Sequence, residues 1–135
     1  MSTPLVSVVI ATYNRAHFIG EAILSVLDQT VQDSEIIVVD DGSTDATSQV
    51  LAQFGGRIQV VRQLNQGRSG ARNSGVSIAR ADIIAFLDSD DIWMPDKLAK
   101  QLSLFDAQPA VGLAHTFSDV VDENGVVLRL SLIHI

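Results

Sequence analysis

Cysteine is absent from this sequence, and basic residues are scarce, with 9 lysines and arginines against 16 aspartates and glutamates. Without cysteine the chain can form no disulfide framework, no thiolate zinc site and no cysteine nucleophile. The formal net charge of −7 argues against a broad nucleic-acid-binding surface, because such a surface needs a basic footprint. We therefore expect no nucleic-acid partner.

Long hydrophobic runs are also missing. The apolar runs have the length of strands and fall short of the ~20 residues that a membrane-spanning helix needs. The first residues, 1–4, lead directly into a predicted strand rather than into the charged and apolar regions of a signal peptide. From these features we expect a cytoplasmic protein.

The chain has 135 residues, of which 47% are hydrophobic. This length fits one ordinary domain, and the apolar fraction excludes a disordered tail. The 9 glycines and 3 prolines are too few for a collagen-like or low-complexity sequence. A globular domain with a substantial core is therefore expected.

Apolar β-branched segments alternate with amphipathic segments along the chain. The former are typical of strands buried on both faces, and the latter of helices with one apolar face. The predicted strands are residues 5–11, 35–40, 57–64, 82–87 and 111–117. Four helices are predicted: one over residues 16–29, one ending near residue 54, one ending at residue 79 and one beginning at residue 95. A hairpin is predicted at residues 120–128.

This order predicts an α/β fold, with an open, mostly parallel, Rossmann-like sheet and helices on both faces. Ligands of such sheets bind beyond the carboxyl ends of the strands. Polar residues follow the first, second and fourth predicted strands, at residues 13–14, 40–41 and 88–91. We expect these clusters to form one site.

The acidic cluster after the fourth predicted strand contains Asp88, Asp90 and Asp91. Mutual repulsion would raise the pKa of at least one of them, and a bound divalent cation would remove that cost. Carboxylate oxygens favour Mg²⁺ or Mn²⁺, and such an ion could bridge the phosphates of a diphosphate. The alternative is a solvated acidic loop at the start of a helix.

Asp41 and Tyr13 are candidates for binding a nucleobase. An ionised carboxylate only accepts hydrogen bonds, so Asp41 suits the imide N–H of uracil, thymine or guanine and does not suit adenine. Tyr13 offers a flat face for stacking. The alternatives are that Asp41 caps a helix, as expected for Asp40 and Asp45, and that Tyr13 is a core aromatic.

Arg72 lies near the start of the third predicted helix, after a glycine-containing loop. Its guanidinium could pair with a phosphate or with one of the aspartates. An ordinary salt bridge is an equally good interpretation at this stage. His17 is expected at the surface.

Four segments occur in order: VSVVIATYNR (6–15), EIIVVDDGSTD (35–45), NQGRSGARNSG (65–75) and IIAFLDSDDIWMPDKL (83–98). Together they resemble the nucleotide-sugar-binding part of a family 2 glycosyltransferase with the GT-A fold, over about residues 4–120. The resemblance implies transfer of a sugar from a nucleotide-diphospho-sugar, with UDP-sugar favoured, usually with inversion and assisted by Mn²⁺ or Mg²⁺.

The resemblance also implies roles for particular residues. The backbone around Ala11, the side chain of Tyr13 and Asp41 would hold the base. Asp90 would be the main metal ligand, and Asp88 would lie near the ribose or the metal. Trp93 would either border the sugar pocket or pack in the core. The full set implied to bind the nucleotide-sugar is Ala11, Tyr13, Asp41, Arg72, Asp88, Ser89 and Asp90.

Members of the family continue for a hundred or more residues beyond the part matched here, and that later half usually supplies the catalytic base. We therefore expect residues 1–129 to be an incomplete GT-A domain whose catalytic base is not identified. Residues 130–135, LSLIHI, match what a common transposon-end adapter would encode, so we expect a non-native tail. A genuine edge strand is the alternative.

Three other functions remain open from the sequence. The first is a receiver-type phospho-acceptor domain, the second is a phosphatase with Asp88 as nucleophile, and the third is a fragment that binds a nucleotide without catalysis. The acceptor, whether saccharide, lipid or protein, is unknown. Because many relatives build surface polysaccharides or modify lipids, the resemblance implies peripheral association of the intact protein with the cytoplasmic face of the membrane.

Overall fold

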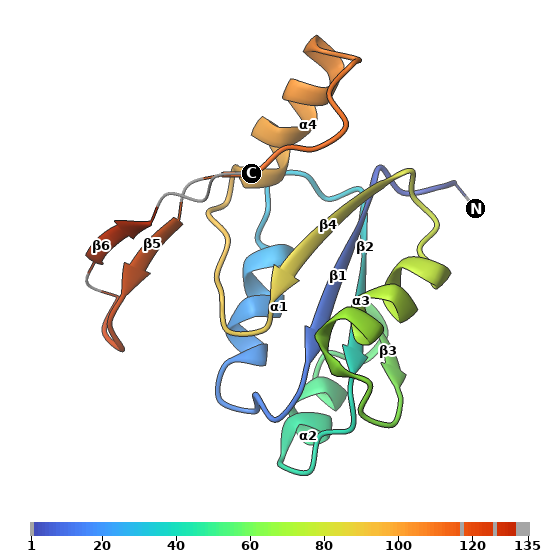
Figure 1. Ribbon diagram of the computed structural model, residues 1–135, viewed down its shortest axis with the longest axis vertical. Coiled ribbons are helices and arrows are strands. Elements are labelled where there is room, and N and C mark those ends of the chain that lie inside the picture. The colour runs from blue at the N-terminus through green and yellow to red at the C-terminus, as the bar shows by residue number, and fades with distance from the viewer. Residues whose placement is uncertain (1, 117, 126, 132–135) are drawn as a thin grey trace. The chain divides into compact units, whose positions relative to one another are not determined.

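A computed structural model describes residues 2–116, 118–125 and 127–131. The chain divides into two compact units, Met1–Leu98 and Ala99–Ile135. The first unit is built on a four-stranded sheet (Figure 1). The second contains most of helix α4 (Lys97–Ala107) and a hairpin.

All strands of the first sheet run parallel, in the order β3-β2-β1-β4. They are β1 (Val6–Thr12), β2 (Ser34–Asp40), β3 (Gln59–Arg62) and β4 (Ile83–Asp88). In this register Thr12 pairs with Asp40, and Ala11 pairs with Asp88. The carboxyl ends of the three strands that the polar clusters follow therefore lie side by side, as predicted.

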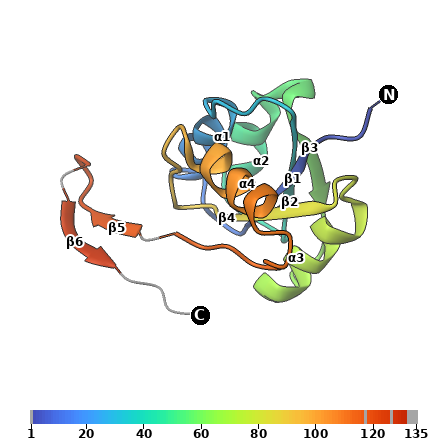
Figure 2. The same cartoon turned by 90° about the horizontal axis from the view of Figure 1, so that it is seen from above.

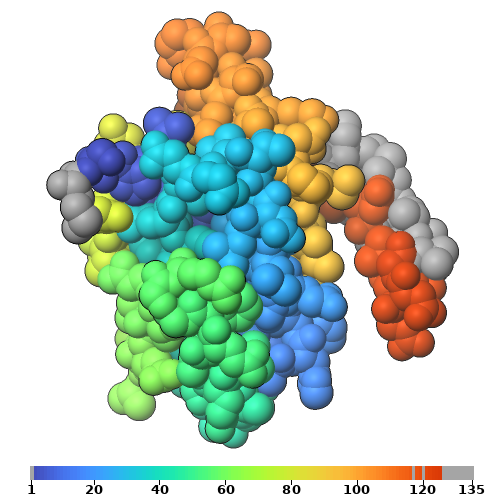
Figure 3. Space-filling model, turned by 180° about the vertical axis from the view of Figure 1, so that it is seen from behind, coloured from blue at the N-terminus to red at the C-terminus, as the bar shows by residue number. Residues whose placement is uncertain are grey.

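Helices cover both faces of the sheet (Figure 2). They are α1 (Ile19–Leu27), α2 (Thr47–Ala52) and α3 (Gly67–Ile78), with a 3₁₀ turn η1 (Gly55–Arg57) after α2. From behind, α1, α2 and η1 lie over the sheet (Figure 3), while α3 packs on the opposite face. α1 and α2 are shorter than the sequence predicted, whereas α3 begins at Gly67, within the predicted glycine-containing loop, and is longer.

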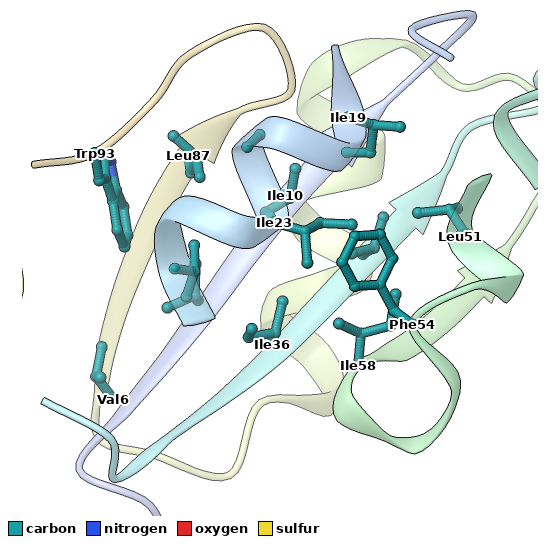
Figure 4. Close-up of a cluster of buried hydrophobic side chains, with 14 of the residues drawn as sticks. Val6, Ile10, Ile19, Ile23, Ile36, Leu51, Phe54, Ile58, Leu87 and Trp93 are labelled. Carbon is teal, nitrogen blue, oxygen red and sulfur yellow. The ribbon is translucent and has the colours of Figure 1, made fainter. Parts of the chain in front are cut away.

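The apolar strands supply a core to each face. Ile10 and Ile36 pack with Ile23 of α1 and with Leu51 and Phe54 in the larger cluster (Figure 4). A second cluster on the other face joins β2 to α3. Both faces of β1 and β2 are covered, which explains why their sequences are almost continuously apolar rather than alternating.

Gly75 allows α3 to lie directly on β1. A Cβ atom at this position would stand 2.4 Å from Cγ1 of Val9, which is closer than two carbons can approach. The helix can therefore pack flush on the strand only with glycine there. This close packing brings the first turn of α3 to the carboxyl edge of the sheet.

Trp93 belongs to the core. Its side chain is 8% exposed and packs in the same cluster as Leu87 and Leu98. The Lys97 ammonium lies 5.3 Å from the centroid of the indole ring. Of the two roles considered for Trp93, packing is the one that the structure supports.

The strand predicted at residues 111–117 is wrong. Residues 111–116 form no strand, and residue 117 lies outside the described residues. The Val111 N–H instead donates to the Gln108 carbonyl in a turn (2.9 Å). An apolar run forms a strand only where a neighbouring strand takes up its backbone hydrogen bonds, and no pairing among the described residues involves this run.

The predicted hairpin is confirmed with shifted ends. β5 (Ser118–Val121) and β6 (Val127–Ser131) pair antiparallel, and Gly125 in the turn has φ +82°. β6 includes the first two residues of the predicted non-native tail, and residues 132–135 lie outside the described residues. The domain boundary at residue 129 stays a prediction. Among the described helices, none is long and apolar enough to cross a membrane.

Glu35 of β2 connects β1 to the segment between α3 and β4, at the amino edge of the sheet, opposite the polar clusters. Its carboxylate accepts hydrogen bonds from the Ser7 hydroxyl, from the Arg80 backbone N–H (2.6 Å) and from Arg80 Nε (3.2 Å). Burial raises the pKa of Glu35, but the hydrogen bonds from Ser7 and Arg80 and the charge of Arg80 outweigh it. The pKa of Glu35 therefore lies below its ordinary value.

Glu35→Gln should lower the free energy of unfolding at pH 7 by about 1–2 kcal/mol, because hydrogen bonds to a charged group are lost. A carboxyl group whose pKa is lowered by folding stabilises above its unfolded pKa and loses that effect as the pH falls through the folded pKa. The difference between variant and wild type should therefore shrink in acid.

Thermal or urea unfolding between pH 7 and pH 3 measures this difference. Glu21→Gln, at an exposed position on α1, is the matched control and should cost less than about 0.5 kcal/mol. A Glu35→Gln deficit that stays constant down to pH 3 would contradict the assignment.

Candidate functional site

The carboxyl edge of the sheet contains a pocket of about 220 Å³. Residues from the ends of β1 and β4, from the loop after β2 and from the start of α3 line it. Six of the predicted binding residues are among them: Ala11, Tyr13, Asp41, Asp88, Ser89 and Asp90. The structure thus brings together residues that are up to 79 positions apart in the sequence (11 to 90).

Asp41 is 3% exposed and binds the segment that leads into α3. Its Oδ1 accepts hydrogen bonds from Gln63 Nε2 and from the Gln66 N–H, both at 2.9 Å. Its Oδ2 accepts one from the Gly67 N–H at 3.0 Å. Asp41 therefore does cap a helix, but it caps α3 on the neighbouring loop rather than α2, which follows it in the sequence.

Asp45 contacts the first residue of α2, as expected for a helix cap, whereas Asp40 contacts only the loop that precedes α2. Asp40 Oδ1 accepts a hydrogen bond from the Ser43 N–H at 3.0 Å. Asp45 accepts hydrogen bonds from the hydroxyl and the N–H of Thr47 in the first turn of α2. The Thr47 hydroxyl, with these backbone donors, lowers the pKa of Asp45 despite some desolvation. Neither carboxylate lines the pocket.

Tyr13 is 46% exposed and lines the pocket, so it is not a core aromatic. Its ring is available as a surface for stacking. The backbone of Ala11 and Thr12 continues the same wall. The alternative of a core aromatic is therefore wrong, and base stacking by Tyr13 stays a prediction.

Asn14 clamps the loop after β1 to the loop after β2. Its N–H donates to Ser43 Oγ (2.9 Å), and its Oδ1 accepts from the N–H groups of Thr44 (2.7 Å) and Asp45 (3.2 Å). Asn14 has φ +52°, a conformation that asparagine tolerates better than most residues. The sequence places Asn14 at a strand end but carries no signal for this role.

Arg72 binds Asp88 rather than the pocket. One guanidinium nitrogen lies 2.8 Å from Asp88 Oδ1, and the guanidinium carbon lies 5.6 Å from the centroid of the Phe86 ring. Arg72 does not line the pocket, whereas Asp88 does. The salt-bridge interpretation is therefore the correct one for this structure, and Arg72 can affect the pocket through the orientation of Asp88.

The acidic cluster presents two of its three carboxylates to the pocket. Asp88 and Asp90 line it, and Asp91 does not. Desolvation and the negative charges of Asp88 and Asp90 raise the pKa of Asp91, which is the repulsion that the sequence predicted. The described residues contain no group of three or more acidic or histidine side chains arranged to hold a metal ion.

Two carboxylates without a third protein ligand still suit a hard divalent cation. Mg²⁺ is usually bound by one or two carboxylates together with substrate phosphates and water. Arg72 occupies Asp88 Oδ1, so Asp88 Oδ2 and both oxygens of Asp90 remain as candidate donors. The donor set fits Mg²⁺ or Mn²⁺ when a phosphate completes the coordination.

Six further residues that were not in the predicted set line the pocket: Thr12, Arg15, Asn65, Gly67, Arg68 and Ala71. Arg15 and Arg68 add positive charge to a pocket that also contains carboxylates. The hydroxyl of Thr12, which is 2% exposed, is the buried side-chain polar atom that finds no hydrogen-bond partner among the described residues. Such positions have no sequence signal of their own, because only the folded register places them beside Asp41 and Asp90.

The parallel sheet, the pocket at its carboxyl edge and the solved structures that share this arrangement identify the fold as α/β of the GT-A type. The family model for glycosyl transferase family 2 matches residues 7–132, and the chain belongs to this family. The receiver-domain and phosphatase alternatives are therefore wrong. His17 is exposed, as expected.

Curated relatives are similar over most of this chain. It is 42% identical over 123 residues to the uncharacterized glycosyltransferase alr2836 of Nostoc sp., covering 88% of this chain and 38% of the relative. It is 47% identical over 103 residues to the Bacillus subtilis glycosyltransferase TuaG, named for teichuronic acid biosynthesis, covering 73% and 41%. The chain thus spans about two-fifths of these relatives.

Solved structures share the fold. The mannosyltransferase PcManGT from Pyrobaculum calidifontis, solved with GDP-Man and Mn²⁺, matches with a TM-score of 0.71 at 27% identity, over 90% of this chain and 37% of that chain. S. aureus TarS matches with a TM-score of 0.70 at 30% identity, over 76% of this chain and 19% of that chain.

Asn14→Ala should lower the free energy of unfolding by about 1 kcal/mol. The variant removes the acceptor for two backbone N–H groups and places alanine at positive φ. Thermal unfolding should show a lower midpoint by several degrees. Asn73→Ala, at an exposed asparagine of α3, is the control. Equal midpoints for the two variants would show that Asn14 does not clamp the loops.

Proposed function

We propose that this chain binds the nucleotide-diphospho-sugar donor of a metal-dependent glycosyltransferase, with a UDP-sugar as the favoured donor. One observation carries the proposal: Tyr13, Asp41, Asp88 and Asp90, from the ends of three strands, line the same pocket. They supply a stacking surface, a hydrogen-bond acceptor for a base and two ligands for a cation. A nucleotide-sugar needs all three.

Asp41 and Tyr13 would bind the base. Asp41 accepts hydrogen bonds and donates none, so it suits an imide N–H, and Tyr13 would stack on the ring. The backbone around Ala11 lies in the same wall and would supply polar contacts at the edge of the base. Uracil and thymine fit this arrangement, while the complex of PcManGT with GDP-Man supports guanine as a second candidate.

Asp90 and Asp88 would hold the Mn²⁺ or Mg²⁺, and Ser89 between them would line the diphosphate end of the pocket. When bound, the ion neutralises negative charge on the diphosphate leaving group. Arg72 would contribute by orienting Asp88 through its ion pair. Arg15 and Arg68 would add positive charge near the same phosphates. The Mn²⁺ in the PcManGT complex supports this role for the motif.

Transfer with inversion needs a base that removes the proton of the acceptor hydroxyl. Asp119, Asp122 and Glu123 are the acids that follow α4, and they lie at the hairpin of the second unit. We assign the role to none of them. The chain spans about two-fifths of the length of these relatives, and we propose that the part it does not span supplies the base and most acceptor contacts.

The name of TuaG supports a saccharide as the acceptor, in the synthesis of a surface polysaccharide. The intact protein would then act at the cytoplasmic face of the membrane. Donor binding without transfer would be the function of this chain by itself if the base lies elsewhere. Whether or not this chain catalyses transfer, donor binding by the pocket is the first property to test.

UDP with Mn²⁺ should raise the thermal midpoint of this chain, and UDP alone should raise it less. Ligand at ~100 times its dissociation constant adds about 2.7 kcal/mol of stability, which corresponds to several degrees for a domain of this size. Asp90→Asn should abolish the metal-dependent part, because it removes a carboxylate and keeps the shape of the side chain.

The matched control is Asp106→Asn, which removes one negative charge at an exposed position of α4 outside the pocket. Differential scanning fluorimetry with UDP, GDP and ADP, each with and without Mn²⁺, separates base from metal effects. A folded protein that responds to none of the three nucleotides would contradict the proposed function.

A further inference from the structure

Gln63 connects Asp41 to helix α3. The side-chain Nε2 of Gln63 donates to Asp41 Oδ1 at 2.9 Å, and its Oε1 accepts a hydrogen bond from the Ser74 hydroxyl at 2.6 Å. The carboxylate can only accept, so the amide nitrogen must face Asp41 and the amide oxygen must face Ser74. The chain of contacts therefore fixes the orientation of the Gln63 amide.

These contacts use most of the hydrogen-bonding capacity of Asp41. A carboxylate oxygen accepts about two hydrogen bonds. Oδ1 already accepts from Gln63 and from the Gln66 N–H, while Oδ2 accepts from the Gly67 N–H alone. Asp41 is 3% exposed, so it has little access to water. One acceptor position, on Oδ2, remains for a ligand in the pocket.

We propose that Gln63, held by Ser74, determines the base selectivity of the pocket by leaving Asp41 able to accept one hydrogen bond from the base. This inference rests on the proposed function, in which Asp41 binds the base. Uracil and thymine present a single imide N–H. Guanine presents a ring N–H and an adjacent amino group, and a carboxylate matches both only when each oxygen has a free position.

As a consequence, the pocket would discriminate against guanine through its hydrogen bonds and without a steric barrier. With Oδ1 filled by Gln63 and Gln66, one N–H of guanine would enter a buried site without an acceptor, and an unpaired buried donor is costly. Gln63 acts through Asp41 and is therefore a positioning residue. Its replacement should affect GDP and UDP differently, whereas a residue needed only for folding would affect both alike.

Gln63→Leu should lower the preference for UDP over GDP about tenfold, because it frees a position on Asp41 Oδ1 for the second N–H of guanine. Ser74→Ala keeps the glutamine but removes the group that orients it, so the preference should fall in the same direction by a smaller factor. Ser74→Ala also keeps the proposal testable if Gln63→Leu does not fold.

The measurement is the dissociation constant of UDP and of GDP, each with Mn²⁺, by titration calorimetry of the whole chain. Gln59→Leu is the matched control, since Gln59 is an exposed glutamine on β3 that does not contact Asp41 or line the pocket. Its UDP to GDP ratio should equal that of the wild type.

Three results would overturn the inference. Equal weakening of UDP and GDP binding by Gln63→Leu would show a merely structural role for Gln63. Tighter binding of GDP than of UDP by the wild type would show that the contacts of Asp41 do not select a pyrimidine, and the proposed donor site would stand. Binding of neither nucleotide by a folded wild type would overturn the proposed function and this inference with it.

Discussion

The register of β1 between β2 and β4 is the constraint on which the rest of this structure depends. Because Thr12 pairs with Asp40 and Ala11 pairs with Asp88, the residues that follow these strands meet at one edge. The register is held by a strand that is buried on both faces, since a slip by one residue would exchange the side chains of its two cores. The position of the pocket therefore depends on the pairing of the strands.

Asp41 holds the start of α3 in place and also lines the pocket. A buried carboxylate must be hydrogen-bonded, and the donors come from Gln63, Gln66 and Gly67, which belong to a different loop. The same bonds that stabilise the start of α3 limit what a ligand can offer to Asp41. Arg72 likewise occupies one oxygen of Asp88 through an ion pair.

The chain corresponds to one part of a longer family architecture. Its match to glycosyl transferase family 2 covers residues 7–132, and it spans about two-fifths of the length of these relatives. All the residues that line the pocket belong to the first unit.

The sequence by itself determined the order of strands and helices, the polar clusters at the strand ends and the family, because each depends on local spacing or on contiguous motifs. It failed at residues 111–116, where an apolar run has no strand beside it. The tertiary structure decided that Arg72 binds Asp88, that Trp93 is buried and that Gln63 reaches Asp41. These contacts join residues distant in sequence, and side-chain partners of that kind are set by packing and register rather than by local pattern.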